Sequence, residues 1–204
     1  MQTSDRSLHS KISAAPFSLH NWLFEDELLI KTAILTLFLL QQAPAENVDW
    51  DKEFGVEERV RDPETGEFPV EPYQQSNENA GAKPFQGEQL PAAFGGREGI
   101  QKIADRTVEL SEADPRISDI FVSHDMVRLK RTLGEQFCYL LGAGCDYSGR
   151  DMRTAHAGLG ATKADLNALV ENLQKAMREA KVPFADQNKL LSKLAPMSKD
   201  VTER

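Results

Sequence analysis

Apolar residues recur at every third or fourth position throughout the C-terminal half of the chain, which is the spacing of one helix face. Four such stripes stand apart from one another, separated by glycine, proline and polar residues. They consist of Ile100, Ile103, Ala104, Val108 and Leu110; Met126, Leu129, Leu133, Phe137 and Leu140; Leu166, Leu169, Val170, Leu173 and Met177; and Phe184, Leu190, Leu191, Leu194 and Met197. No strand-like alternation competes with them. The pattern predicts an all-α domain over residues 93–204, with four main helices packed as two antiparallel pairs.

Signals for helix ends agree with these stripes. Asp125 is placed to cap the second helix, and Gly142 follows its last apolar residues. Thr162 and Asp165 form an approximate capping box in front of the third helix. We expect a short helical turn, Met152–His156, in the connection between these two helices.

Residues 46–92 have a different composition, rich in proline and in acidic and amide side chains. The prolines are Pro63, Pro69, Pro72, Pro84 and Pro91. No apolar period is sustained, and such a stretch cannot bury enough surface for a core of its own. We interpret it as a mostly irregular, Pro-rich acidic extension or linker. The composition favours a solvated linker; the alternative is an extended segment, such as residues 70–80, whose aromatic side chains dock on the following domain.

Residues 1–45 have the order of a signal or targeting segment. An apolar run over residues 32–40 follows Lys31 and precedes a small-x-small ending at Ala43 and Ala45. The run is shorter than the roughly 20 apolar residues that span a bilayer. We therefore expect cleavage before Glu46, a periplasmic or secreted protein, and no stable membrane span after processing; a buried helix is the alternative. The acidic stretch before the run does not fit a signal, so we expect translation to start near Leu28 or Leu29, at a non-standard start codon.

Charge and cysteine content narrow the environment. The net charge of -8 disfavours a nucleic-acid partner, whose phosphates attract basic proteins. Cys138 and Cys145 are the only cysteines. The chain can fold back at the intervening glycines, so a disulfide is geometrically possible, and export would permit it. The alternative is one buried and one exposed thiol.

Histidine is scarce, and this limits the metal chemistry. Of the four histidines, His9 and His20 lie in the N-terminal segment, which leaves His124 and His156 for the domain. A zinc site needs three or four ligands. One proximal histidine is enough to hold the iron of haem. The chain has no Cys-x-x-Cys-His motif, so any haem is expected to be the b type, without thioether bonds.

Several motifs carry a resemblance when they are taken in order. They are Phe94-Gly-Gly-Arg-Glu98, Ala113-Asp-Pro-Arg-Ile-Ser-Asp-Ile-Phe121, Asp125-Met-Val-Arg-Leu-Lys130, Gly142-Ala-Gly-Cys-Asp-Tyr-Ser-Gly149 and Arg150-Asp-Met-Arg-Thr-Ala-His-Ala-Gly-Leu-Gly160. The set resembles the truncated globins, the two-over-two helical haem proteins. Within them it is most similar to group I, in an exported form with an N-terminal extension.

The resemblance implies roles for ten residues. His156 aligns with the iron ligand, and Phe121 with the phenylalanine that stacks on haem. The other implied positions are Leu129, Leu133 and Phe137 on the distal side, Arg128 and Tyr147 at the propionates, Met152 and Ala155 on the proximal side, and Val108 on helix B.

The distal positions depart from the family pattern. Group I globins often carry a tyrosine on helix B and a glutamine on helix E, where this chain has Val108 and Leu133. Thr107, Thr132 and His124 are the nearest polar side chains, and His124 is a possible sixth iron ligand. The resemblance thus implies reversible binding of dioxygen or another diatomic gas. The alternatives are a haem enzyme, either a nitric-oxide dioxygenase or a weak peroxidase with a reductase partner, and a haemless helical interaction module.

Overall fold

The computed structural model describes residues 53–55 and 59–203. The predicted targeting segment and the predicted mature start at Glu46 lie outside these residues. All regular elements from residue 59 onward are helical, and the all-α prediction is confirmed for this part of the chain. The elements are η1 (Asn77–Ala80), α3 (Gln89–Ala93), α4 (Gly96–Glu112), η2 (Ser118–Ile120), α5 (Met126–Leu141), α6 (Met152–His156), α7 (Lys163–Glu179), α8 (Phe184–Leu194), η3 (Ala195–Met197) and α9 (Ser198–Val201).

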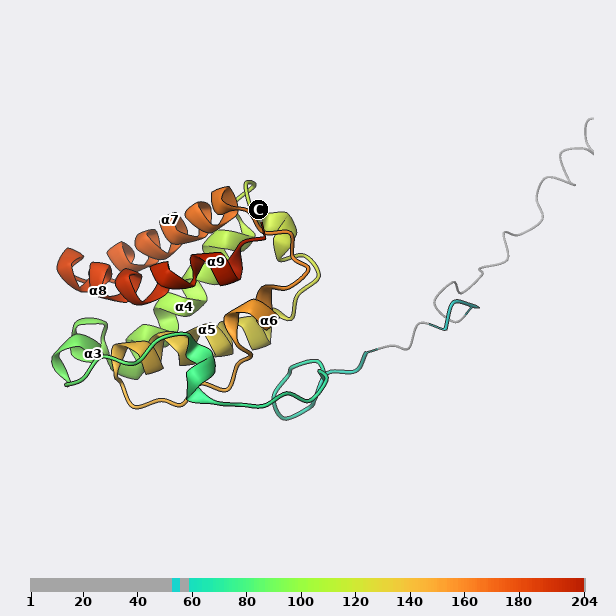
Figure 1. Ribbon diagram of the computed structural model, residues 1–204, viewed down its shortest axis with the longest axis horizontal. Coiled ribbons are helices and arrows are strands. Elements are labelled where there is room, and N and C mark those ends of the chain that lie inside the picture. The colour runs from blue at the N-terminus through green and yellow to red at the C-terminus, as the bar shows by residue number, and fades with distance from the viewer. Residues whose placement is uncertain (1–52, 56–58, 204) are drawn as a thin grey trace, which may run out of the picture. The chain divides into compact units, whose positions relative to one another are not determined.

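The four long helices α4, α5, α7 and α8 are the four that the apolar stripes predicted. Helix α4 packs against both α5 and α7, and α8 packs against the same two helices. Figure 1 shows α7 and α8 together on one side of the domain, with α4 and α5 on the other. Ile100, Ile103, Leu140, Met177 and Leu190 fill the space between them and are almost fully buried. Burial of these side chains supplies the main driving force for packing.

The predicted helix ends are confirmed. The Asp125 carboxylate accepts from the Val127 N–H at 3.2 Å, at the start of α5. Thr162 and Asp165 form a reciprocal capping box in front of α7. Gly142 ends α5 with a φ of 78°, and a side chain here would collide with the Phe85 carbonyl oxygen. Only glycine satisfies both conditions without strain.

The last predicted helix is shorter than its apolar stripe. Helix α8 ends at Leu194, and a 3-10 turn and α9 follow it. Pro196 lies in this turn, and a proline has no N–H to continue a helix. Phe184 was expected on the inner face but is 72% exposed, so this part of the prediction was wrong.

Residues 59–88, here called the docked arm, pack on the helical domain. The Phe85 N–H donates to the Leu140 carbonyl at 2.9 Å, and the Tyr73 hydroxyl donates to the Ser148 carbonyl at 2.8 Å. Glu67 is only 6% exposed. For this stretch the favoured interpretation, a solvated linker, was wrong, and the docked alternative is correct. The arm attaches through hydrogen bonds and ion pairs and through a few isolated apolar residues such as Ala80 and Phe85, which leave no apolar period in the sequence.

A disulfide joins Cys138, near the end of α5, to Cys145 in the following loop. Their Cα atoms are 5.6 Å apart, as the geometry of a disulfide requires. Cys138 is 3% exposed and belongs to the core. The predicted bridge is confirmed.

Candidate functional site

A cavity of about 470 Å³ is bordered by side chains from α4, α5, α6, α7 and α8. This volume lies in the usual range for sites that bind small molecules or cofactors. Most of its lining is apolar. All ten residues that the sequence assigned to a site border this one cavity: Val108, Phe121, Arg128, Leu129, Leu133, Phe137, Tyr147, Met152, Ala155 and His156.

Helices α4 and α5 contribute an apolar part of the lining. Leu129, Leu133 and Phe137 follow one another at intervals of four, so α5 presents them on one face. Val108 reaches the cavity from α4, and Phe121 from the turn after η2. These five side chains offer only carbon to a ligand.

The hydroxyl groups in this region are already bonded to helix backbone. Thr107 donates to the Ile103 carbonyl at 2.7 Å, and Thr132 donates to the Arg128 carbonyl at 2.9 Å. Each hydroxyl has one proton, so neither has another to donate. The third polar residue predicted here, His124, also borders the cavity but is exposed.

The short helix α6 carries His156. The Asp151 carboxylate caps the helix by accepting from the Thr154 N–H at 3.0 Å. His156 is half-buried, and its Nδ1 lies 2.7 Å from the Met152 carbonyl oxygen. A carbonyl only accepts, so Nδ1 carries the proton and donates it. In the neutral ring, this arrangement leaves the lone pair on Nε2, the nitrogen through which imidazole could then bind a metal.

Polar side chains gather at one part of the border. Arg128 donates through Nη2 to the Phe68 carbonyl at 2.6 Å, while its buried Nε–H has no partner. Tyr147 is buried and donates to the Arg150 carbonyl at 3.0 Å, and burial raises the pKa of its hydroxyl. The region thus holds a permanent cation and a neutral phenol.

Sequence reasoning missed several residues of the lining. Val70 and Tyr73 reach the cavity from the docked arm, and Arg150 from the loop before α6. Gln136 also borders the cavity and donates to the Ala80 carbonyl at 3.1 Å. Tyr73, an isolated aromatic residue, was the one sequence feature that suggested docking, and it did not indicate which surface the arm would contact.

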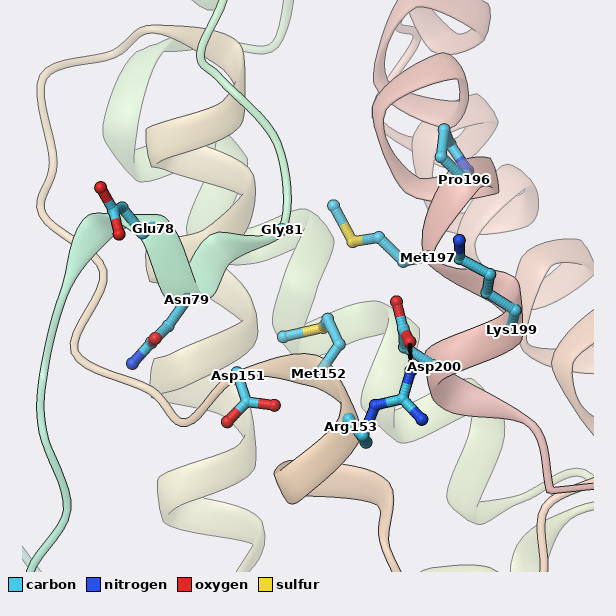
Figure 2. Close-up of a pocket in the computed structure, with 10 residues that line it drawn as sticks. All are labelled: Glu78, Asn79, Gly81, Asp151, Met152, Arg153, Pro196, Met197, Lys199 and Asp200. Carbon is cyan, nitrogen blue, oxygen red and sulfur yellow. Dashed lines mark hydrogen bonds and ion pairs between the residues drawn. The ribbon is translucent and has the colours of Figure 1, made fainter.

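A second cavity, of about 400 Å³, adjoins this site (Figure 2). Met152 and Met197 border both cavities, and Figure 2 shows both side chains extending into the space between η1 and the C-terminal helices. The other border residues are mainly charged, including an ion pair between Arg153 and Asp200. The two methionines therefore form a shared apolar partition.

The part of the chain that the structure describes has neither a cluster of metal-ligating side chains nor a helix suited to a membrane. No group of three or more His, Cys, Asp or Glu side chains there is arranged to hold a metal ion. Nor does this part of the chain contain a helix of the length and apolarity that a membrane span needs.

The fold is similar to those of solved truncated hemoglobins. The Tetrahymena pyriformis protein in its Fe(III) form has a TM-score of 0.54 and 23% identity, covering 57% of this chain and 100% of that one. The 2/2 hemoglobin of a Synechococcus species, in the cyanomet state and with covalently attached heme, has a TM-score of 0.53 and 24% identity over the same shares. At these identities the likeness establishes the fold. The molecule is an all-helical globin of the two-over-two class, as the sequence predicted.

The sequence comparison identifies the family. A family model described as bacterial-like globin matches residues 90–203, which is more than half of the chain. The chain belongs to the bacterial-like globin family, and a globin of this family is a haem-binding protein.

Two relatives are named group 1 truncated hemoglobins. One, GlbN of Mycolicibacterium paratuberculosis, is 28% identical over 108 residues, or 53% of this chain and 79% of the relative. The other, LI410 of Chlamydomonas moewusii, is 34% identical over 102 residues, or 48% of this chain and 58% of the relative. The family match and both relatives account for about half of this chain, and the match begins at residue 90, after the docked arm.

Proposed function

We propose that this globin holds a b-type haem through His156 and reversibly binds dioxygen or another diatomic gas. The carrying observation is the position of the His156 ring at the cavity, with Nδ1 bonded to the Met152 carbonyl, so that Nε2 is the nitrogen left for a metal. When bound, haem supplies an iron centre with an open position for a small gas. His156 holds that iron from the protein side, and the carbonyl fixes the orientation of the ring.

The residues of the cavity fit such a cofactor in three ways. Apolar side chains line most of its wall, as a tetrapyrrole face requires. The single imidazole supplies the axial ligand. Arg128 brings a permanent positive charge to the cavity border, which favours a carboxylate there.

The apolar wall supports gas binding without a catalytic cycle. Val108, Leu129 and Leu133 donate no hydrogen bond, and the Thr107 and Thr132 hydroxyls are committed to backbone carbonyls. A polar gas therefore lacks a stabilising hydrogen bond worth about 1 kcal/mol. The alternatives, a nitric-oxide dioxygenase or a weak peroxidase supplied by a reductase, are less well supported by this lining.

The test is an absorption spectrum of the purified protein, with and without reductant and carbon monoxide. A haem Soret band is expected in the full chain. His156→Ala should abolish stoichiometric haem retention, whereas the other described histidine, His124, provides the matched control: His124→Ala should retain haem. An unchanged spectrum in His156→Ala contradicts the proposal, and a changed ferric spectrum in His124→Ala identifies that residue as a sixth ligand.

We also propose that the protein is exported, with cleavage near Glu46. The Cys138–Cys145 disulfide supports this, because such bonds persist in oxidising compartments. Mass spectrometry of protein from native cells should find an N-terminus near residue 46 in the periplasmic or secreted fraction. Intact chains confined to the cytosol would contradict export and leave the haem proposal untouched.

A further inference from the structure

Two arginines at the cavity border are directed by the backbone of the docked arm. Arg128 Nη2 donates to the Phe68 carbonyl at 2.6 Å, and Arg150 Nη2 donates to the Glu71 carbonyl at 3.0 Å. Arg150 also lies over the Tyr73 ring, 4.8 Å from its centre. Helix α5 and the loop before α6 supply these guanidinium groups, while the arm determines where they point.

One N–H donor of Arg128 has no hydrogen-bond partner. Its Nη2 forms an ion pair with the Glu67 carboxylate at 3.1 Å, and Glu67 is also bound by Arg131 through two nitrogens. The Arg128 Nε–H is buried without a partner. A buried charged donor is unfavourable unless it finds an acceptor. Arg128 also borders the cavity, so its positive charge lies beside any ligand bound there.

Side chains of the arm also form part of the cavity wall. Val70 and Tyr73 border the cavity together with Arg128 and Arg150. The Tyr73 hydroxyl is fixed by its bond to the Ser148 carbonyl, whereas Val70 remains 45% exposed. This part of the border therefore combines two fixed cations with a partly exposed apolar wall.

From these observations we infer that residues 67–73 belong to the haem site, although they lie before the family match. They position Arg128 and Arg150 for the two carboxylates of the tetrapyrrole, and Val70 and Tyr73 cover that edge. The inference rests on the proposed haem function and extends it to a segment outside the globin domain. It predicts that haem retention depends on charge at position 70.

The experiment measures haem loss from the full chain to an excess of a haem-free scavenger globin. Val70→Glu should speed loss about tenfold or more, and Val70→Lys should slow it, because each places a charge near the carboxylates. Val60 is the matched control in the same arm, 73% exposed and not part of the cavity border. Val60→Glu and Val60→Lys should leave the rate unchanged.

A second variant tests the arginine directly. Arg150→Gln should also speed haem loss about tenfold. Arg97→Gln is its control, because Arg97 likewise donates to loop carbonyls, at 2.9 and 2.6 Å, but does not border the cavity. Repeating each measurement with haem dimethyl ester, which has no carboxylates, should abolish the effects at positions 70 and 150. A general folding defect would persist with the ester.

The outcomes separate the two proposals. If the protein holds haem through His156 but the Val70 variants behave like the Val60 variants, the arm inference is overturned and the proposed function stands. Effects that persist with the ester also overturn the carboxylate role. If the unmodified chain binds no haem, both proposals fail.

Discussion

Loss of the Cys138–Cys145 disulfide should lower stability by an amount that follows from the loop it closes. The two cysteines are seven positions apart. The chain-entropy relation for a loop of this length gives about 2.4 kcal/mol at 25 °C. For a domain of roughly 150 residues, each kcal/mol shifts the melting midpoint by about 2–4 °C, so the expected loss is about 5–10 °C.

The folded structure indicates that this loss arises mainly in the unfolded chain. After reduction, the end of α5 keeps the bond from the Ala143 N–H to the Cys138 carbonyl at 3.0 Å. It also keeps the bond from Phe85 to Leu140. Because the native loop remains held by these contacts, the main effect of reduction is to release the unfolded ensemble.

The assay is thermal unfolding followed by helical circular dichroism, with and without a thiol reductant. Cys145→Ser provides the control, since Cys145 is only partly buried and the change leaves no large void. Reductant should lower the midpoint of the unmodified protein to that of Cys145→Ser, and should not affect the variant. Equal midpoints for both proteins without reductant would refute the entropic reasoning. If the reductant lowered the melting midpoints of both proteins equally, its effect would come from reduction of the haem iron and not of the disulfide.

Three further predictions concern the cavity and the arm. Val108→Tyr should slow dioxygen release roughly tenfold in flash photolysis, since a new hydrogen bond of about 1.4 kcal/mol is a factor of ten; an unchanged rate would show that the hydroxyl does not reach the gas. The bond from Arg131 lowers the pKa of Glu67 below its ordinary 4.5, so the stabilisation is present above that pH and is lost as pH falls through the lower folded value. The stability difference between the unmodified protein and Glu67→Gln, from denaturant titrations, should therefore vanish in acid; a difference independent of pH would contradict this. Haem removal should lower the melting midpoint, because a ligand that binds only the folded state stabilises it; equal midpoints would argue against a cofactor site.

The sequence predicted the helices because their signals are local. Asp125, Thr162 and Gly142 act on neighbouring backbone groups, and each apolar stripe is read within one helix. The ten site residues could be assigned because the motifs around them resemble a known family. That the structure brings all ten to one cavity is an independent result, and their roles toward haem stay predictions.

Docking was one of the two interpretations of the arm, but its contacts could not be predicted, for a physical reason. Its contacts join backbone carbonyls such as those of Phe68 and Glu71 to distant arginines, and a carbonyl carries no sequence signature. Pro196 is a local signal that was overlooked: it lies in the turn that ends α8, but the apolar stripe continues to Met197 and predicted a longer helix. The orientation of the His156 ring was likewise invisible, because it depends on a carbonyl one turn earlier in α6.

The position of the arm in the chain has a consequence for the order of folding. During synthesis the arm emerges first, yet the partners of Phe68, Glu67 and Tyr73 follow 57 to 75 residues later. Contacts of such long separation form only after the loop between them can close. The hydrogen bonds within each helix join residues that are close in sequence, so helix formation does not depend on the arm. The arm, which precedes the globin domain in the chain, can therefore dock only after α5 and the loop that follows it have been made.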